Sequence, residues 1–182
     1  MSLVVAMLVA LSVFAAVLMC IVVYNDLVAL RRRCDNARSD IDVQLKHRFD
    51  LVPTLIEAVK GHAALEKGTL DAVTKAHNAV GDGPTCETGA RAHALLGAAL
   101  DRLIAVAEAY PEVKTSENFV ELSELENRIV AARLYLNGAV GEFNTAIERF
   151  PGNLLAGLFG FTARSFCDVG TDRQMTVRQA PR

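Results

Sequence analysis

The side chains that could carry out acid–base or metal chemistry are few and scattered along the chain. The histidines are His47, His62, His77 and His93. On a helix, His62 and Glu66 would share a face and could offer two metal ligands, but a catalytic zinc site needs a third, and no HExxH motif occurs. His77 falls on an apolar helical stripe, which favours a hydrogen-bonded core histidine. The pattern therefore predicts no metal residues.

The candidate nucleophiles also lack activating neighbours. The sequence contains no GxSxG motif, no P-loop and no Gly-rich βα fingerprint. The cysteines are Cys20, Cys34, Cys86 and Cys167; they form no CxxC pair, and we expect ordinary thiols in a reducing compartment. Cys34 lies on an apolar seam, where a thiol is a poor nucleophile. We predict no catalytic or cofactor-binding residues, no cofactor and no enzymatic activity; a metal-dependent hydrolase using His47, His62 or Glu66 is the less favoured alternative.

The strongest feature of the sequence is an apolar N-terminal segment. Residues 1–25 carry no charged side chain, and the run from Leu3 to Val23, roughly 30 Å as a helix, matches the hydrocarbon core of a bilayer. No basic residue precedes it, and Met19 stands before Cys20 where a lipoprotein leader has a small residue, so we predict a retained transmembrane helix. The basic cluster at 31–33 then predicts an N-terminus outside and a domain in the cytoplasm.

The helix that leaves the membrane is expected to continue into a soluble domain. No Gly or Pro occurs before Pro53, and apolar residues recur at helical spacing from Leu27 to Leu45. The basic residues 46–48 predict the end of this helix, with Asp50 capping a second one. Residues 81–85 form a clear break. Further stripes at 92–110 and 119–150, the latter nearly heptad as in a coiled coil, complete an all-α four-helix antiparallel up-and-down bundle, continuous with the transmembrane helix.

The chain after the fourth helix is apolar, broken by glycines and too short to span a membrane. It either lies in the membrane interface beside the anchor or caps the base of the bundle. We expect a transmembrane anchor at 1–25, a bundle at 26–151, an apolar membrane-proximal tail at 152–170 and a disordered tail at 171–182. The residues predicted at the membrane interface are Tyr24, Arg31, Arg32, Arg33, Leu154, Leu158, Phe159, Phe161 and Phe166.

Several blocks of the sequence carry a family resemblance. The first run is Tyr-Asn-Asp-Leu-Val at 24–28, followed by blocks at 39–46 and 48–53; a C-terminal set includes Glu-Asn-Arg-Ile at 126–129 and ends with Phe-Pro at 150–151. With these blocks the chain resembles the bacterial LemA family over nearly its whole length. The resemblance implies a single-pass protein of the bacterial cell membrane, or of an internal membrane derived from it, with a four-helix bundle and no established enzymatic activity. Relatives in magnetosome membrane formation suggest a role in membrane organisation.

Two groups of polar residues form a candidate interaction surface. They are Asp40, Asp42, Gln44, Lys46, Arg48 and Asp50 at the distal end of the first predicted helical hairpin, and Asn137 and Asn144, one heptad apart on the predicted fourth helix. Such positions either are solvated and hydrogen-bonded between helices or bind a partner and set the oligomeric state.

The sequence as a whole favours a non-enzymatic, membrane-anchored scaffold or adaptor. We expect it to associate with itself as a homo-oligomer, or to organise other membrane proteins or the shape of the membrane. The formal net charge of −2 and the scarcity of aromatic residues argue against a nucleic-acid partner, so membrane lipid and membrane proteins are the expected partners. A small-ligand or peptide sensor is the alternative.

Overall fold

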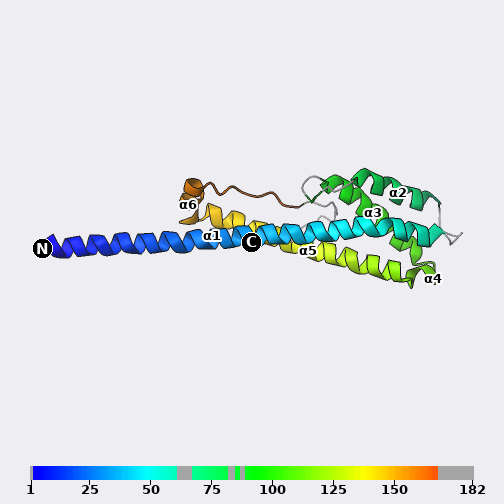
Figure 1. Ribbon diagram of the computed structural model, residues 1–182, viewed down its shortest axis with the longest axis horizontal. Coiled ribbons are helices and arrows are strands. Elements are labelled where there is room, and N and C mark those ends of the chain that lie inside the picture. The colour runs from blue at the N-terminus through cyan, green and yellow to red at the C-terminus, as the bar shows by residue number, and fades with distance from the viewer. Residues whose placement is uncertain (1, 61–66, 82–84, 87–88, 168–182) are drawn as a thin grey trace, which may run out of the picture. The chain divides into compact units, whose positions relative to one another are not determined.

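The computed structural model describes residues 2–60, 67–81, 85–86 and 89–167, and within these ranges every regular element is a helix (Figure 1). The helices are α1 (Ser2–Lys60), α2 (Lys67–Val80), α3 (Ala90–Ala107), α4 (Pro111–Lys114), α5 (Glu117–Glu148) and α6 (Gly152–Phe159). The chain divides into two compact units. Unit 1 comprises residues 1–38 and 134–166, and unit 2 comprises residues 39–133 and 167–182. Helices α1 and α5 contribute residues to both units.

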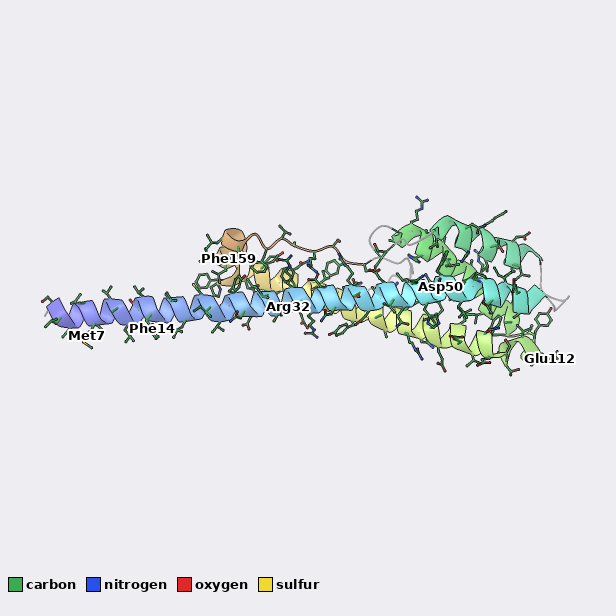
Figure 2. All side chains as sticks on the ribbon, in the orientation of Figure 1. Met7, Phe14, Arg32, Asp50, Glu112 and Phe159 are labelled. Carbon is green, nitrogen blue, oxygen red and sulfur yellow. A yellow bond between two sulfur atoms is a disulfide. The ribbon has the colours of Figure 1, made fainter. Side chains whose placement is uncertain are left out.

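The N-terminal half of α1 is long and apolar enough to cross a membrane. Its most apolar window has a mean hydropathy of 2.9, and none of that window is buried within the protein. The helix then continues without a break into the polar part of the sequence (Figure 2), because no Gly or Pro interrupts it before Pro53. The predicted continuity of the apolar segment with the first helix of the domain is confirmed.

The predicted end of this first helix at residues 46–50 is wrong, because α1 runs on to Lys60. The apolar stripe does not stop at Leu45 but continues through Val52, Leu55 and Ile56, all of them buried. Pro53 removes one backbone donor inside the helix, so the carbonyl of Phe49 has no partner four residues on. The imidazole Nε2 of His77 lies 3.0 Å from that oxygen and donates to it instead.

Unit 2 is built around a core shared by several helices. Helix α2 packs against α3, and α3 contacts α4. Leu45 and Leu55 of α1 and Leu100 of α3 are buried with almost no exposed surface. The remaining large members of this core are Leu96 and Leu103 of α3 and Leu122 and Leu125 of α5.

Unit 1 has its own core, formed by the parts of α1 and α5 that belong to it. Leu27 of α1 and Leu136 and Phe143 of α5 are almost completely buried. Helix α6 adds Leu155, which is 8% exposed. The segment between α5 and α6 contains Pro151, so the predicted stop of the fourth helix near this proline is confirmed.

The other predicted helix boundaries agree with the structure to different degrees. Helix α2 ends at Val80 and is followed by Gly81 in the left-handed conformation (φ 67°), which confirms the predicted break there. Helix α5 begins at Glu117, close to the predicted start. Helix α3 ends at Ala107, earlier than predicted, and Pro111 opens the short α4, where its missing N–H costs nothing.

Candidate membrane-contact site and interaction surface

Helix α6 has one buried side and one bare apolar side. Leu155 and Ala156 pack into unit 1 with 8% and 7% of their surfaces exposed. On the other side, Leu154 and Leu158 are 65% and 76% exposed, and Phe159, at the edge of the buried side, still has 54% of its surface exposed. The interpretation of the tail as a cap is therefore correct for one side of α6, while the other side leaves contact with a membrane open as a proposal.

Two glycines mark the two ends of α6. A Cβ at Gly152 would collide with the carbonyl oxygen of Ala146, so only glycine lets the chain pass so close to the end of α5. Gly160 adopts the left-handed conformation (φ 71°), and the Phe161 N–H donates to the Ala156 oxygen at 3.0 Å. Gly160 therefore ends α6 with a C-terminal turn that a larger residue would strain.

Aromatic rings join α6 to the end of the apolar anchor within unit 1. The ring of Tyr24 lies 4.8 Å from the ring of Phe159 and 5.9 Å from that of Phe161, between centroids. Phe143 of α5 lies 6.4 Å from Phe161. Figure 2 shows Phe159 beside α1, between the labelled residues Phe14 and Arg32. The structure thus brings together four of the residues predicted at the membrane interface: Tyr24, Phe159, Phe161 and, through α6, Leu158.

The three arginines after the anchor differ in their surroundings. Arg31 and Arg32 are exposed. Arg33 donates to the Tyr135 hydroxyl at 3.2 Å and forms an ion pair with Glu142 at 2.7 Å. The bond to Tyr135, and then the charge of Glu142, raise the pKa of Arg33 above its ordinary value. Arg33 therefore joins α1 to α5, whereas Arg31 and Arg32 remain available to solvent or to lipid headgroups.

Residues 161–166, which we call the strap, run from α6 and are fixed within unit 1 at Arg164. The Asn144 amide donates to the Arg164 carbonyl and accepts from its N–H, both at 2.9 Å. The Arg164 guanidinium forms an ion pair with Asp35 at 2.6 Å and lies 5.7 Å from the centre of the Phe143 ring. Asn144 thus holds the strap rather than facing a partner. Phe166, predicted at the membrane interface, lies in the strap and is 58% exposed.

The candidate interaction surface is divided between the two units. In unit 2, Asp40, Lys46 and Asp50 are exposed, and Lys46 forms an ion pair with Asp50 at 3.2 Å. Val43 lies among them along α1 with 61% of its surface exposed. Asp42 instead accepts the backbone N–H of Cys86 at 2.8 Å. Gln44 is half-buried, and so is Asn137 in unit 1. Neither side chain is therefore fully exposed for contact with a partner.

Arg48 is not part of an accessible surface, because it is 2% exposed inside unit 2. Its guanidinium lies 3.3 Å from both carboxylate oxygens of Glu126 and donates to the His93 carbonyl at 3.0 Å. Gly97 leaves room for it, since a Cβ there would lie 3.3 Å from Nη1 of Arg48. Burial raises the pKa of Glu126 although Arg48 opposes the shift.

The spacing of charged residues in the sequence indicates this buried ion pair, although it is not among the features predicted above. Arg48 continues the stripe of Leu45 and Val52 at spacings of three and four residues, and Glu126 lies in the same way between Leu122 and Ile129. Two opposite charges at core positions of two helices indicate a pair.

His47 and His77, which could have acted as bases or metal ligands, contact other residues of the helical fold. His77 stacks on Phe49 with ring centres 4.1 Å apart and makes the predicted hydrogen bond, but it is half-buried and so not a full core residue as expected. His47 lies in the middle of α1 rather than at a helix end, and its side chain is exposed. Its Nε2 lies 3.1 Å from the Glu121 carboxylate. His62 and Glu66 lie outside the described residues. Among the described residues, no three metal-ligating side chains of His, Cys, Asp or Glu gather at one point.

Two of the four cysteines are bonded to each other and two are free thiols. Cys86 and Cys167 form a disulfide, so the expectation of four ordinary thiols is wrong for these two. Cys20 and Cys34 are free thiols. Cys34 is buried on the seam of α1, and burial raises its thiol pKa, in agreement with the expectation that it is a poor nucleophile.

Taken together, a helical chain with one membrane-length apolar helix and a bare apolar face beside that helix defines a candidate single-anchor helical membrane protein. The chain belongs to the LemA family, whose model matches residues 37–182. It is 27% identical to the magnetosome protein MamQ of Magnetospirillum gryphiswaldense and 30% identical to the magnetosome proteins MamQ 1 and MamQ 2 of Paramagnetospirillum magneticum. Each comparison covers 83% of this chain, which spans 66% of the length of these relatives.

Proposed function

We propose that the protein is a non-enzymatic, membrane-anchored scaffold that contacts the bilayer twice: through the apolar half of α1 and through the bare side of α6. The observation that carries the proposal is the contact between Tyr24, at the end of the apolar segment, and Phe159 of α6. An element held at that point lies at the level where a membrane-spanning helix would leave the hydrocarbon. Aromatic rings with a polar tip, such as Tyr24, are favoured at this level.

The free energy available to the second contact is large enough to matter. Complete burial of a Leu or Phe side chain is worth about 1.5–3 kcal/mol. Leu154, Leu158 and Phe159 each have more than half of their surface still exposed. Transfer of these surfaces to the interface would therefore contribute roughly 3–5 kcal/mol, enough to hold unit 1 against the membrane in a fixed orientation about the anchor.

Charge supports the orientation in which unit 2 lies in the cytoplasm. Arg31 and Arg32 are exposed directly after Tyr24 and are suited to the anionic headgroups of a cytoplasmic leaflet. The N-terminus would then lie outside, in a bacterial cell membrane or an internal membrane derived from it. The MamQ relatives are magnetosome proteins, which supports an internal membrane as one setting.

The scaffold role requires a second surface that binds protein. We assign it to the exposed side of α1 in unit 2, where Val43 lies among Asp40, Lys46 and Asp50. An exposed aliphatic residue surrounded by charges of both signs suits a second copy of the chain or another membrane protein. In this proposal α1, α2, α3 and α5 form the antiparallel, coiled-coil-like bundle of the LemA type.

Photocrosslinking from single positions tests both contacts in the full chain. A photoreactive residue at Leu158 should form adducts with phospholipid, whereas one at Val43 should give recurrent protein adducts, either dimers or one membrane partner. Ser165, exposed in the strap, provides a control position of neither kind. Only unmodified monomer from position 43, in native membranes, would contradict the scaffold role, and the absence of lipid adducts from position 158 would contradict the second membrane contact.

A groove in unit 2 favours a second candidate function, a small-ligand or peptide sensor. It has a volume of about 490 Å³ and lies beside the His47–Glu121 contact, lined by His47, Glu117, Val120, Glu121, Glu124, Leu125 and Arg128. Its mixture of apolar and charged walls suits a small amphipathic ligand. A thermal-shift screen of the full chain in detergent tests this function, with Val120→Arg as the variant that should abolish any shift.

A further inference from the structure

The disulfide between Cys86 and Cys167 joins two segments that are 81 residues apart in the sequence. Cys86 lies in the connection between α2 and α3, and Cys167 directly follows the strap. The two residues are only 2% and 5% exposed. Neither the predicted scaffold role nor the membrane contact makes use of this bond.

Each cysteine is positioned by contacts that do not depend on the bond between them. The backbone N–H of Cys86 donates to the Asp42 carboxylate, which ties its segment to α1. Three residues before Cys167, Arg164 is fixed on both sides of its peptide unit by Asn144. Both cysteines belong to unit 2 and their Cα atoms lie 6.0 Å apart, so the two thiols of a reduced protein can form the bond again within that unit, which favours the bond over reaction with separate partners.

In the proposed orientation, this bond lies in the reducing environment of the cytoplasm. Thiols in a reducing cytoplasm stay reduced, and the disulfides that do form there are transient or redox-sensing. We propose that Cys86 and Cys167 are a reversible redox pair that joins the chain directly after the strap to the α2–α3 connection, within unit 2, when the compartment becomes oxidising. This inference rests on the cytoplasmic placement of unit 2 in the proposed function, and the bond constrains the chain at Cys167 rather than the anchor.

The closing reaction is thiol–disulfide exchange with a small-molecule disulfide. One cysteine thiolate attacks a sulfur of the oxidant, forms a mixed disulfide and releases one small thiol. The second cysteine thiolate then attacks the protein sulfur of that mixed disulfide, the Cys86–Cys167 bond forms and the second small thiol leaves. The protein loses two electrons and two protons, and the oxidant is reduced to two thiols. Because both cysteines are buried, exchange requires local opening of the structure around them.

The test uses the full chain in detergent, with Cys20→Ser and Cys34→Ser so that only the pair can react. The protein is equilibrated in mixtures of reduced and oxidised glutathione, quenched with acid and alkylated with a mass-tagged maleimide. We expect a single two-electron titration in which the protein goes from fully reduced to fully bonded and back. Asp42→Ala should lower the equilibrium constant for the bond about two- to tenfold, since it removes the carboxylate that accepts the backbone N–H of Cys86. The matched control Asp71→Ala, at an exposed position of α2, should leave that constant unchanged.

Two results would overturn the inference. One is a bond that excess dithiothreitol cannot reduce in the folded protein, which would make it a permanent crosslink. The other is a folded protein, shown by circular dichroism, that remains a dithiol in oxidised glutathione alone. Trapping in growing cells adds the biological arm: the pair should be reduced at rest and bonded after treatment with diamide. A pair that is already bonded in unstressed cells would contradict the switch, while the photocrosslinks from positions 43 and 158 report separately on the scaffold role and the membrane contact.

Discussion

The buried ion pair in unit 2 provides the sharpest test of how this domain is held together. Removing one partner of a buried pair leaves the other charge without compensation and costs about 3–5 kcal/mol. Glu126→Leu leaves Arg48, whose side chain is 2% exposed and cannot give up its proton. We expect this variant to lose about 3 kcal/mol of unfolding free energy, towards the lower end of that range because the His93 carbonyl still accepts from Arg48.

The reverse substitution should cost less, and the difference is the informative quantity. Arg48→Met leaves Glu126, whose side chain is 18% exposed and whose pKa burial already raises. This carboxyl can take up a proton and become neutral, so the loss should shrink as the pH falls. In the double variant both charges are gone, and its unfolding free energy should lie within about 1–2 kcal/mol of the wild type.

Denaturant unfolding of the full chain in detergent micelles, followed by circular dichroism at 222 nm, measures all three variants. Lys46→Met, which breaks an exposed ion pair with Asp50, is the matched control and should produce no measurable change. The reasoning would be refuted if Glu126→Leu were as stable as this control, or if the double variant were no more stable than the worse of the two single variants.

Three further predictions follow from named contacts. Because burial raises the pKa of Glu126, the folded protein binds a proton at this carboxylate more readily than the unfolded chain does. The unfolding free energy of the wild type, relative to that of Glu126→Gln, should therefore rise as the pH is lowered from 7 towards about 4.5. A difference between these two free energies that does not change with pH would contradict this. His77→Phe should lose about 1–3 kcal/mol because the Phe49 carbonyl is left unpaired; adding Pro53→Ala, which restores a helical N–H, should recover part of the loss, and an unchanged midpoint in the double variant would argue against the bond. Gly152→Ala should displace α6, since its Cβ would meet backbone at the end of α5, and protease cleavage after α5 should become faster while the anchor remains in the membrane fraction.

Local features of the sequence predicted local features of the fold. The absence of charge before residue 26 indicated the anchor, and the absence of Gly and Pro before Pro53 indicated its continuity with the domain. Gly81 and Pro151 marked real ends of helices. These features were predictable because a helix is made by hydrogen bonds and side-chain spacing within one short stretch of chain.

The errors arose where distant residues decide the outcome. The basic run at 46–48 is typical of a helix end, but Arg48 lies inside unit 2 because Glu126, on another helix, compensates its charge. Pro53 is tolerated within α1 because His77 supplies the missing donor. The pairing of Cys86 with Cys167 likewise depends on a fold that spacing alone does not reveal.

The candidate site was predicted in part for the same reason. Apolar composition marked Leu158 and Phe159 as residues for a membrane or a cap, but only the structure shows that α6 buries one side and leaves the other bare. Asn144 was assigned to an interaction surface on its spacing, whereas its partner is the backbone of Arg164, 20 residues further on. Polar residues on a helix have many possible partners, and sequence spacing does not choose among them.

The proposed function depends most on the second membrane contact. Tryptophan fluorescence tests this contact most directly, because the wild-type chain contains no tryptophan and one introduced residue is the single reporter. Leu158→Trp in the full chain, reconstituted into liposomes with lipids brominated near the headgroup, places a single reporter on the bare side of α6. Leu95→Trp, at a position 54% exposed on α3 in unit 2, is the matched control. We predict blue-shifted emission at position 158 that brominated lipid quenches, and water-like, unquenched emission at position 95. Water-like, unquenched emission at position 158, from protein that floats with the liposomes, would contradict the account.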